Sequence, residues 1–280
     1  MKMPFLPKIP IEKAVDNSID WLTDNFSFIT KAISDYVEIG IKGLVTGLDF
    51  IPPWLFIIIA TFLVFYLTKN KGLGSFTFLG LLLIWNLGLW EATMSTIALV
   101  LFATSLALLI GVPLGILAAL FDSFYKVVMP ILDFMQTMPA FVYLIPAIPF
   151  FGLGVVSAAF ATVIFAMPPS IRLTCLGIRQ VPEELIEASE AFGSTRMQKL
   201  VKLQIPIATP TIMAGINQTI MLSLSMVVIA AMIGAKGLGG EVWTAIQRFK
   251  PGMGFEAGLG VVIIAIIFDR VTQTLAKNKK

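Results

Sequence analysis

The side chains that carry out most enzyme chemistry are scarce in this sequence. It has no histidine and a single cysteine, Cys175, so a metal centre or a Ser–His–Asp or Cys–His arrangement has too few groups to be built. It also contains neither a G-x-x-x-x-G-K-[ST] phosphate loop nor a G-x-G-x-x-G turn, two common nucleotide-binding patterns. The sequence therefore predicts no catalytic residue, no metal site and no cofactor bound by this chain.

Ionisable residues inside apolar sequence are the next candidates for chemistry. The main cases are Asp133 and the adjacent Asp269 and Arg270. A charged side chain at the centre of a bilayer costs about 2.5 to 3.5 kcal/mol, so such residues are usually paired or functional. A proton relay needs several of them along one route, which this sequence lacks. We expect Asp133 to lie near the inner membrane interface, paired or hydrated there.

A polar segment at residues 182–206 has the chemistry of a helix-turn-helix. Pro182 suits the first turn of a helix, and the two acidic residues that follow it favour the positively polarised helix start. Gly193 is able to adopt a positive φ and so predicts the end of this helix. Ser194 is then expected to cap a second helix that runs through Leu200.

The surface of this segment has the composition of a docking element. Ala188 and Ser189 are small enough to let a partner approach closely, and Glu187 and Glu190 offer charges to basic groups on that partner. We expect the segment to transmit movement between this chain and a separate cytoplasmic protein. The alternative is an amphipathic loop without a partner.

The rest of the chain must hold this segment at a membrane. Of 280 residues, 57% are hydrophobic and 13% are charged, and the mean hydropathy is +0.90, which excludes an ordinary soluble domain. A spanning helix needs about 20 apolar residues, and we expect an all-α integral membrane protein with about seven spans. The predicted spans are residues 52–68, 73–90, 92–121, 127–150, 154–176, 209–233 and 254–275.

The distribution of Lys and Arg sets the expected orientation. More than half of the 20 basic residues fall in loops and a tail on the side of the 182–206 segment, and the loops after the second and fourth spans have none. Because basic residues favour the cytoplasmic side, we expect the amino terminus outside and the carboxyl terminus inside. The basic residues are dispersed rather than gathered in one stripe, so no nucleic-acid partner is expected.

Proline and glycine interrupt two of the predicted spans. Residues 111–113 interrupt the third span, and Met138-Pro139, with Pro146 and Pro149, interrupt the fourth. Such breaks free backbone carbonyls, which need neighbouring helices or water to bind them. They indicate either a flexible translocation path or ordinary packing kinks.

The first 50 residues form a separate amphipathic segment. Apolar residues recur every three or four positions from Ile11 to Leu48, which defines one face of a helix. Three placements stay open: on the outer membrane surface, against the spans of the same chain, or against a soluble partner. Residues 234–249 predict an outer loop or a partial re-entrant helix.

Three groups of residues in the docking segment follow a known order: Glu187-Ala188-Ser189, then Gly193, then Leu203-Gln204-Ile205-Pro206. Together they resemble the EAA signature of bacterial ABC-importer permeases. Ser189 replaces the second alanine, Leu203 the usual isoleucine and Ile205 the usual leucine, and each change keeps size or hydrophobicity. The resemblance implies an ATPase-coupling loop at residues 177–206, with the site residues Glu187, Ala188, Ser189, Glu190, Gly193, Leu203, Ile205 and Pro206.

Residues 133–143, 215–218 and 226–240 are similar to those of glycine betaine and proline betaine permeases. This resemblance implies the type I importer fold and a homodimer in the lipid of a bacterial cytoplasmic membrane. It also implies two ABC ATPase subunits, which bind ATP and Mg, and an extracytoplasmic substrate-binding protein. The chain would then be a transporter subunit without its own ATPase site.

The candidate translocation path consists of Phe134, Met138, Pro139, Phe141, Asn217 and Met226. Aromatic faces attract trimethylammonium groups, although aromatic residues in spans more often serve packing. The predicted organisation is an amphipathic segment (1–50), two accessory spans (51–91), an importer core (92–275) and a tail (276–280). Choline, carnitine or another quaternary amine is the alternative substrate, and a stand-alone secondary transporter is the alternative class.

Overall fold

The computed structural model describes residues 10–277, and these form helices with no strand among them. The all-α fold class is therefore confirmed. The first nine residues of the predicted amphipathic segment and residues 278–280 of the predicted tail lie outside the described part. The helices are α1 (Ile11–Asp49), α2 (Pro53–Thr68), α3 (Lys71–Asn86), α4 (Trp90–Leu120), α5 (Asp122–Thr137), η1 (Ala140–Tyr143), α6 (Leu144–Phe151), α7 (Val155–Ala166), α8 (Pro168–Arg179), α9 (Glu183–Ala191), α10 (Arg196–Lys199), η2 (Leu200–Gln204), α11 (Ile205–Ala230), η3 (Ala231–Ile233), α12 (Leu238–Gln247) and α13 (Pro251–Lys277).

The spanning helices are fewer than the seven apolar stretches suggested. Within residues 10–277, four helical runs are long and apolar enough to cross a membrane: α4, α7 with α8, the run Arg196–Ile233, and α13. Two bent pairs, α1 with α2 and α5 with the helix after it, raise the number to six if each pair counts as one span. α2 and α3 have 16 residues each, or about 24 Å of helix, which is short for a hydrocarbon core of about 30 Å.

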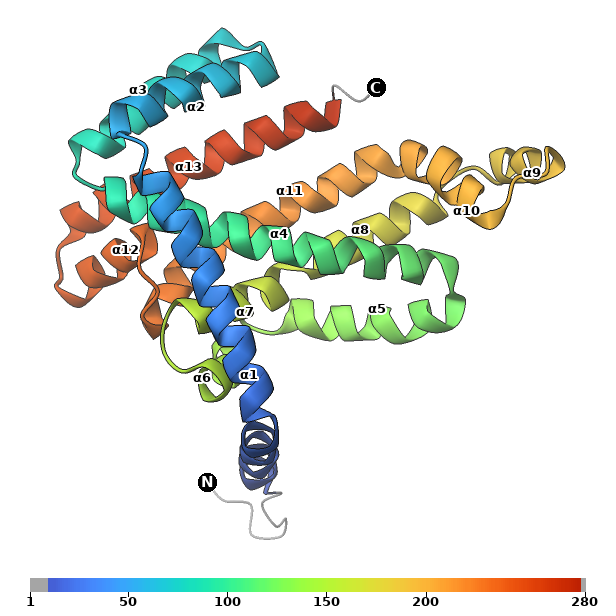
Figure 1. Ribbon diagram of the computed structural model, residues 1–280, viewed down its shortest axis with the longest axis horizontal. Coiled ribbons are helices and arrows are strands. Elements are labelled where there is room, and N and C mark those ends of the chain that lie inside the picture. Colours follow the sequence, from blue (N-terminus) through green and yellow to red (C-terminus); the bar gives the residue numbers. More distant parts are fainter. Residues whose placement is uncertain (1–9, 278–280) are drawn as a thin grey trace, which may run out of the picture.

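α4, α8 and α11 run side by side and form the centre of the molecule (Figure 1). Two glycines of α4 allow its close contact with α8. A Cβ atom on Gly115 would lie 2.7 Å from the carbonyl oxygen of Ile171, and one on Gly111 would lie still closer to the side-chain Oγ of Ser170. The helices pack at backbone distance here, which no larger residue would permit.

The two predicted helix breaks have different outcomes. The break at Met138-Pro139 is confirmed, because α5 ends at Thr137 and the next helix is bent from it by 113°. The predicted interruption at residues 111–113 is wrong, since α4 continues through Pro113. Gly111 and Gly115, on both sides of Pro113, lie in close contact with α8, and a neighbouring helix of this kind lets a spanning helix tolerate a proline.

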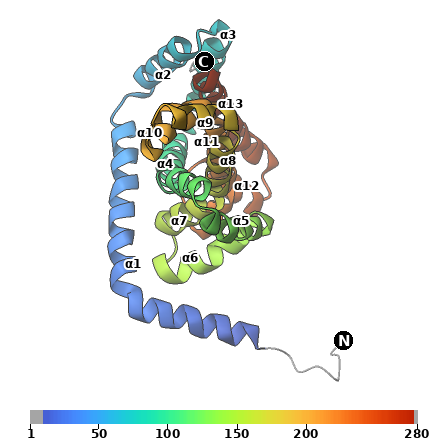
Figure 2. The same cartoon turned by 90° about the vertical axis from the view of Figure 1, so that its right-hand side faces the viewer.

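α1 crosses the other helices instead of running alongside them (Figures 1 and 2). Its later part packs against the same chain: Ile41 is 2% exposed and joins a core cluster with Leu99 and Tyr143. Its earlier part keeps Trp21 and Phe28 exposed. The end of α1 therefore packs against the chain's own helices. For the start of α1, a position on the outer membrane surface stays a prediction.

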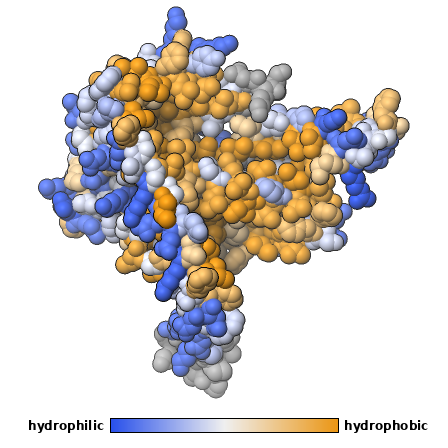
Figure 3. Space-filling view, viewed as in Figure 1, coloured by the Kyte–Doolittle hydropathy of each residue, from blue (hydrophilic) through white to orange (hydrophobic). Residues whose placement is uncertain are grey.

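The surface colours agree with a membrane setting. Figure 3 shows a broad apolar area over the middle of the molecule, with hydrophilic residues gathered at one end and at the opposite tip. At the end that lies opposite α9 in Figure 1, α12 forms within the predicted outer loop. The Leu238 N–H of α12 donates to Thr96 Oγ1 of α4 at 2.8 Å. This bond fixes the outer loop to the central helices.

Candidate coupling loop and intramembrane polar groups

α9 stands at the tip of the molecule, beyond the ends of α4, α8 and α11 (Figure 1). It begins after Pro182 with two acidic residues in its first turn, as predicted. It ends in a Schellman motif: the Gly193 N–H donates to the Glu190 carbonyl at 2.8 Å, and the Ser194 N–H donates to the Ser189 carbonyl at 3.0 Å. Gly193 has a φ of +78°, which confirms the prediction that it ends this helix with a positive φ.

The second helix of the loop differs from the prediction in its start and its end. Thr195, not Ser194, is the capping residue, because Ser194 is already used by the Schellman motif. The Thr195 N–H donates to Gln198 Oε1 at 2.9 Å, and the Gln198 N–H donates to Thr195 Oγ1 at 3.3 Å, which is a capping box. The helix does not stop at Leu200 but passes through the π-helical turn η2 into α11.

The tip carries apolar side chains that the sequence analysis did not single out. No residue of α9 is buried, and Phe192 and Met197 are 91% and 68% exposed. Glu187 and Ala188 are also exposed, whereas Glu190 forms an ion pair with Lys199 within the loop. The signal for Phe192 and Met197 was their apolar character in an otherwise polar segment.

The root of the loop is packed against the spanning helices. Ile178 at the end of α8, Leu200 and Ala208 form a buried cluster, and Ile205 packs against it. Leu203 is half-buried and Pro206 is exposed. The EAA-like residues thus divide into an exposed tip and a packed root, so movement of the tip is passed to α8 and α11.

The structure brings some of the six candidate path residues together: four lie around the α5 break, and one of these, Met138, packs against the core cluster that contains Met226. Phe134, Pro139 and Phe141 are exposed near the α5 break, and Met138 beside them is half-buried. Met226 is 0% exposed in the core. Asn217 lies between α11 and α13, where its Nδ2 donates to Asp269 Oδ1 at 2.9 Å and its Oδ1 accepts from Thr272 at 2.5 Å.

Two ion pairs join α5 to α8. Arg172 Nη2 lies 2.5 Å from Asp133 Oδ1, and Arg179 Nη2 lies 2.6 Å from Asp122 Oδ1. The expected pairing of Asp133 is present. Its expected place near the inner interface stays a prediction.

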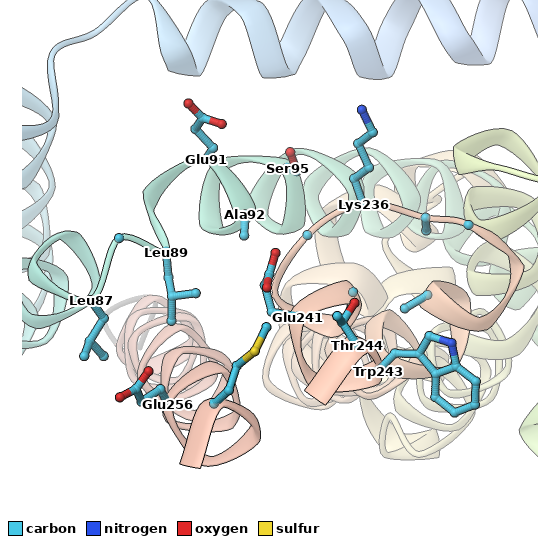
Figure 4. Close-up of a pocket in the computed structure, with 17 residues that line it drawn as sticks. Leu87, Leu89, Glu91, Ala92, Ser95, Lys236, Glu241, Trp243, Thr244 and Glu256 are labelled. Atoms are coloured by element: carbon cyan, nitrogen blue, oxygen red, sulfur yellow. The ribbon is translucent and has the colours of Figure 1, made fainter. Parts of the chain in front are cut away.

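A pocket of about 680 Å³ opens at the end of the molecule opposite α9. Figure 4 shows acidic side chains from three helices around it, Glu91, Glu241 and Glu256, together with Lys236. Burial raises the pKa of the nearby Asp49 carboxyl, and the Glu91 carboxylate raises this pKa further. The end of the molecule opposite α9 therefore has acidic character.

A bundle of apolar helices with a capped, protruding helical loop has the architecture of an integral membrane protein. The sequence pattern of the family described as "Binding-protein-dependent transport system inner membrane component" matches residues 111–279. The chain belongs to this family.

Relatives and a solved structure agree with this assignment. The chain is 52% identical to the glycine betaine transport system permease protein OpuAB of Bacillus subtilis, over 99% of this chain and 98% of the relative. It is 52% identical to the glycine betaine/carnitine transport permease protein GbuB of Listeria monocytogenes, over 99% of both chains. It is 44% identical to the glycine betaine/proline betaine permease ProW of Escherichia coli, over 97% of this chain and 77% of the relative. A chain of the inward-facing MetNI methionine ABC transporter shares the fold, with a TM-score of 0.62 at 22% identity over 66% of this chain and 93% of that chain.

Proposed function

We propose that this chain is the transmembrane subunit of an ATP-driven importer of glycine betaine, proline betaine and related quaternary amines. Two copies enclose the translocation path, two ABC ATPase subunits bind ATP and Mg and dock on the coupling loops, and an extracytoplasmic substrate-binding protein delivers the substrate. The substrate class is supported by the names of OpuAB, GbuB and ProW. The chain itself has no ATPase site.

The protruding loop is the observation that carries this proposal. α9 has no buried residue, yet a Schellman motif defines its end and a capping box defines the start of α10 directly after it. An exposed helix without a packed face is not stabilised by the chain's own core, and Phe192 and Met197 offer it an apolar surface. A partner that covers this surface provides the missing burial.

The proposed orientation follows from the same loop. The carboxyl end of α13 and the turn between α2 and α3 lie towards the α9 end of the molecule, and α12 lies at the opposite end (Figure 1). If α9 meets cytoplasmic ATPases, the carboxyl terminus is inside and the segment at residues 1–50 is outside. The α2–α3 hairpin (51–91) is an accessory to the importer core (92–275).

The mechanism is alternating access. ATP binding closes the ATPase subunits, α9 moves with them, and its packed root transmits the movement to α8 and α11. The break at Met138-Pro139 lets α5 and α6 change their relative angle, which turns the path outward. Hydrolysis in the partner subunits resets the inward-facing state.

Reconstitution in vesicles tests the proposal. Glycine betaine uptake is expected only with ATP, both ATPases and the binding protein present, and uptake by the purified permease alone would support a stand-alone secondary transporter. Competition by choline, carnitine and proline betaine ranks the substrates. Failure of every quaternary amine would refute the substrate class.

Docking is tested separately by a matched pair of variants. Phe192→Ser at the tip is expected to reduce co-purification of the ATPase subunits. Phe249→Ser is the control, because Phe249 is also 91% exposed but lies just after α12 at the outer end. Equal loss of ATPase in both variants would contradict the assignment of α9.

A further inference from the structure

A second pocket, of about 490 Å³, lies where the α2–α3 turn meets the polar end of α13. Both of these features lie towards the α9 end of the molecule (Figure 1), whereas the acidic pocket lies at the opposite end. The lining of the second pocket contains no acidic side chain among the described residues. Its polar members are Thr68, Asn70, Arg270, Gln273 and Thr274. The pocket therefore favours an anion over a cation.

The residues around this pocket mark the edge of the apolar surface. α2 is apolar up to its last turn, and residues 69–71, which follow it, are Lys-Asn-Lys. α13 is apolar over residues 261–268 and turns polar at Asp269. Phe62 and Tyr66 of α2 are 67% and 69% exposed just before this change. Basic and polar residues that follow exposed aromatic residues are typical of the level of the lipid headgroups, so we place the pocket at that level.

Arg270 is the one charged side chain among the described residues of the lining. It is 61% exposed, and its Nε lies 3.8 Å from Asp269 Oδ2, which is too long for a hydrogen bond. The Asp269 carboxylate instead accepts hydrogen bonds from Asn217 and Gln273 at 2.9 and 2.7 Å. No described residue accepts a hydrogen bond from the Arg270 guanidinium. Its N–H donors are therefore available to a ligand in the pocket.

Two lysines in the α2–α3 turn add positive charge beside the pocket. Lys69 and Lys71 are exposed, and among the described residues neither forms an ion pair with an acid. Between them, Asn70 Oδ1 accepts from the Gly72 N–H at 2.9 Å and from the Leu73 N–H at 3.2 Å. These bonds fix the turn and occupy amide groups at the start of α3. The positive charge of this corner therefore comes from side chains and not from the helix start.

The remaining side chains of the lining are apolar: Leu73, Phe76 and Ile266. Ile266 lies one turn before Arg270 on α13, and Phe76 lies one turn beyond Gly72 on α3, so both lie towards the apolar parts of their helices. A soluble phosphate would leave this apolar wall in contact with water, which is unfavourable. A zwitterionic lipid would bring its ammonium group close to the guanidinium, which has the same charge. An anionic amphiphile matches both sides of the lining.

We propose that this pocket binds one anionic phospholipid. The lipid phosphate accepts hydrogen bonds from Arg270, Lys69 and Lys71 add attraction to its charge, and one acyl chain lies against Phe76 and Ile266. The bound lipid joins the α2–α3 hairpin to the end of α13. The site is independent of what the chain transports. The proposed function adds only that this lipid belongs to the cytoplasmic leaflet.

Lipid binding to the purified full-length chain, with the subunits that co-purify with it, tests the site without a transport assay. Dioleoyl phosphatidylglycerol or dioleoyl phosphatidylcholine is added to the detergent solution, and native mass spectrometry counts the lipid molecules that stay bound. We expect the anionic phosphatidylglycerol to bind about tenfold more tightly than phosphatidylcholine. Equal affinities for the two lipids would overturn the proposal.

Substitutions of two exposed basic residues locate the site. Arg270→Gln is expected to weaken phosphatidylglycerol binding about tenfold, because it removes both the charge and the paired donors. Lys71→Gln removes one charge from the turn and should weaken binding about fivefold. The control is Arg248→Gln, which removes an exposed arginine just after α12 and should keep the affinity within about twofold. Affinities of the two pocket variants equal to that of the control would overturn the proposal.

Two further ligands separate a phospholipid from other occupants of the pocket. Dihexanoyl phosphatidylglycerol has the same headgroup with short acyl chains and should bind about tenfold more weakly than the dioleoyl lipid. Inorganic phosphate, at the concentration that saturates binding of phosphatidylglycerol, should displace none of it. Displacement by phosphate, or equal binding of the short-chain lipid, would assign the pocket to a soluble anion and overturn the proposal. Lipid binding only after removal of the co-purified subunits would show that a protein covers the pocket, with the same consequence.

Discussion

Replacing Gly193 tests the coupling loop with the least disturbance elsewhere. Its φ is +78°, and a Cβ atom added there would meet no atom within 4 Å. The cost of a substitution is therefore the left-handed backbone alone, roughly 1 to 2 kcal/mol for a residue other than glycine. That cost shifts the equilibrium between the ordered and the frayed form of the carboxyl end of α9 about 5- to 30-fold towards the frayed form.

The expected order of ATP-driven uptake follows from this backbone cost. Asn tolerates the left-handed region better than Ala, and a β-branched residue tolerates it least, so uptake should fall in the order Gly193, Gly193→Asn, Gly193→Ala, Gly193→Val. Gly193→Pro should be the most severe, because it fixes a negative φ and removes the N–H that donates to the Glu190 carbonyl.

Gly88 provides a matched control at the other end of the molecule. Its φ is +71° and a Cβ atom there would also meet nothing within 4 Å, so Gly88→Ala has the same backbone cost. Uptake and ATP hydrolysis should stay coupled in Gly88→Ala and become uncoupled in Gly193→Ala. Equal coupling in the two variants, or normal coupling in Gly193→Pro, would refute the role of the Schellman motif.

Two further substitutions test the packing that supports the site. Gly115→Leu overpacks the α4–α8 contact, since even a Cβ atom would lie 2.7 Å from the Ile171 carbonyl oxygen. We expect a cost in stability of about 1 to 3 kcal/mol and a lower melting temperature in detergent. The control Gly258→Ala, in open space on α13, should keep the normal melting temperature. Asn217→Leu removes the hydrogen bond from Asn217 to the Asp269 carboxylate, which then keeps the hydrogen bond from the Gln273 side chain. We expect a loss of stability of about 1 to 3 kcal/mol. An unchanged melting temperature would show that the α11–α13 contact does not depend on this bond.

The parts of the structure that depend on neighbouring residues in the chain were predictable from the sequence. The ends of α9 follow from Pro182 and Gly193, and the break after α5 follows from Pro139, because capping and proline effects act within one or two turns. The same reasoning chose Ser194 over Thr195 as a cap, since it did not foresee that the Schellman motif takes up the Ser194 N–H.

The features that depend on packing between distant segments were not predictable. Arg172 lies within a predicted span, and nothing in the sequence places it opposite Asp133, 39 positions away. Pro113 stays within α4 because α8 holds the helix on both sides. Asn217 was placed in the path, whereas Asp269 and Thr272 of α13 engage its side chain.

α8 connects the coupling loop of the proposed mechanism to the spanning helices. α8 carries Arg172 in its first half and enters the coupling loop after Arg179, and Gly177 fits it closely against Ala208 and Thr211 of α11. α8 and α11 therefore move as one body when an ATPase displaces α9. α5 is held less firmly, since Leu132 is its only buried residue. The same displacement therefore acts on the two ion pairs that join α8 to α5, Asp133–Arg172 and Asp122–Arg179.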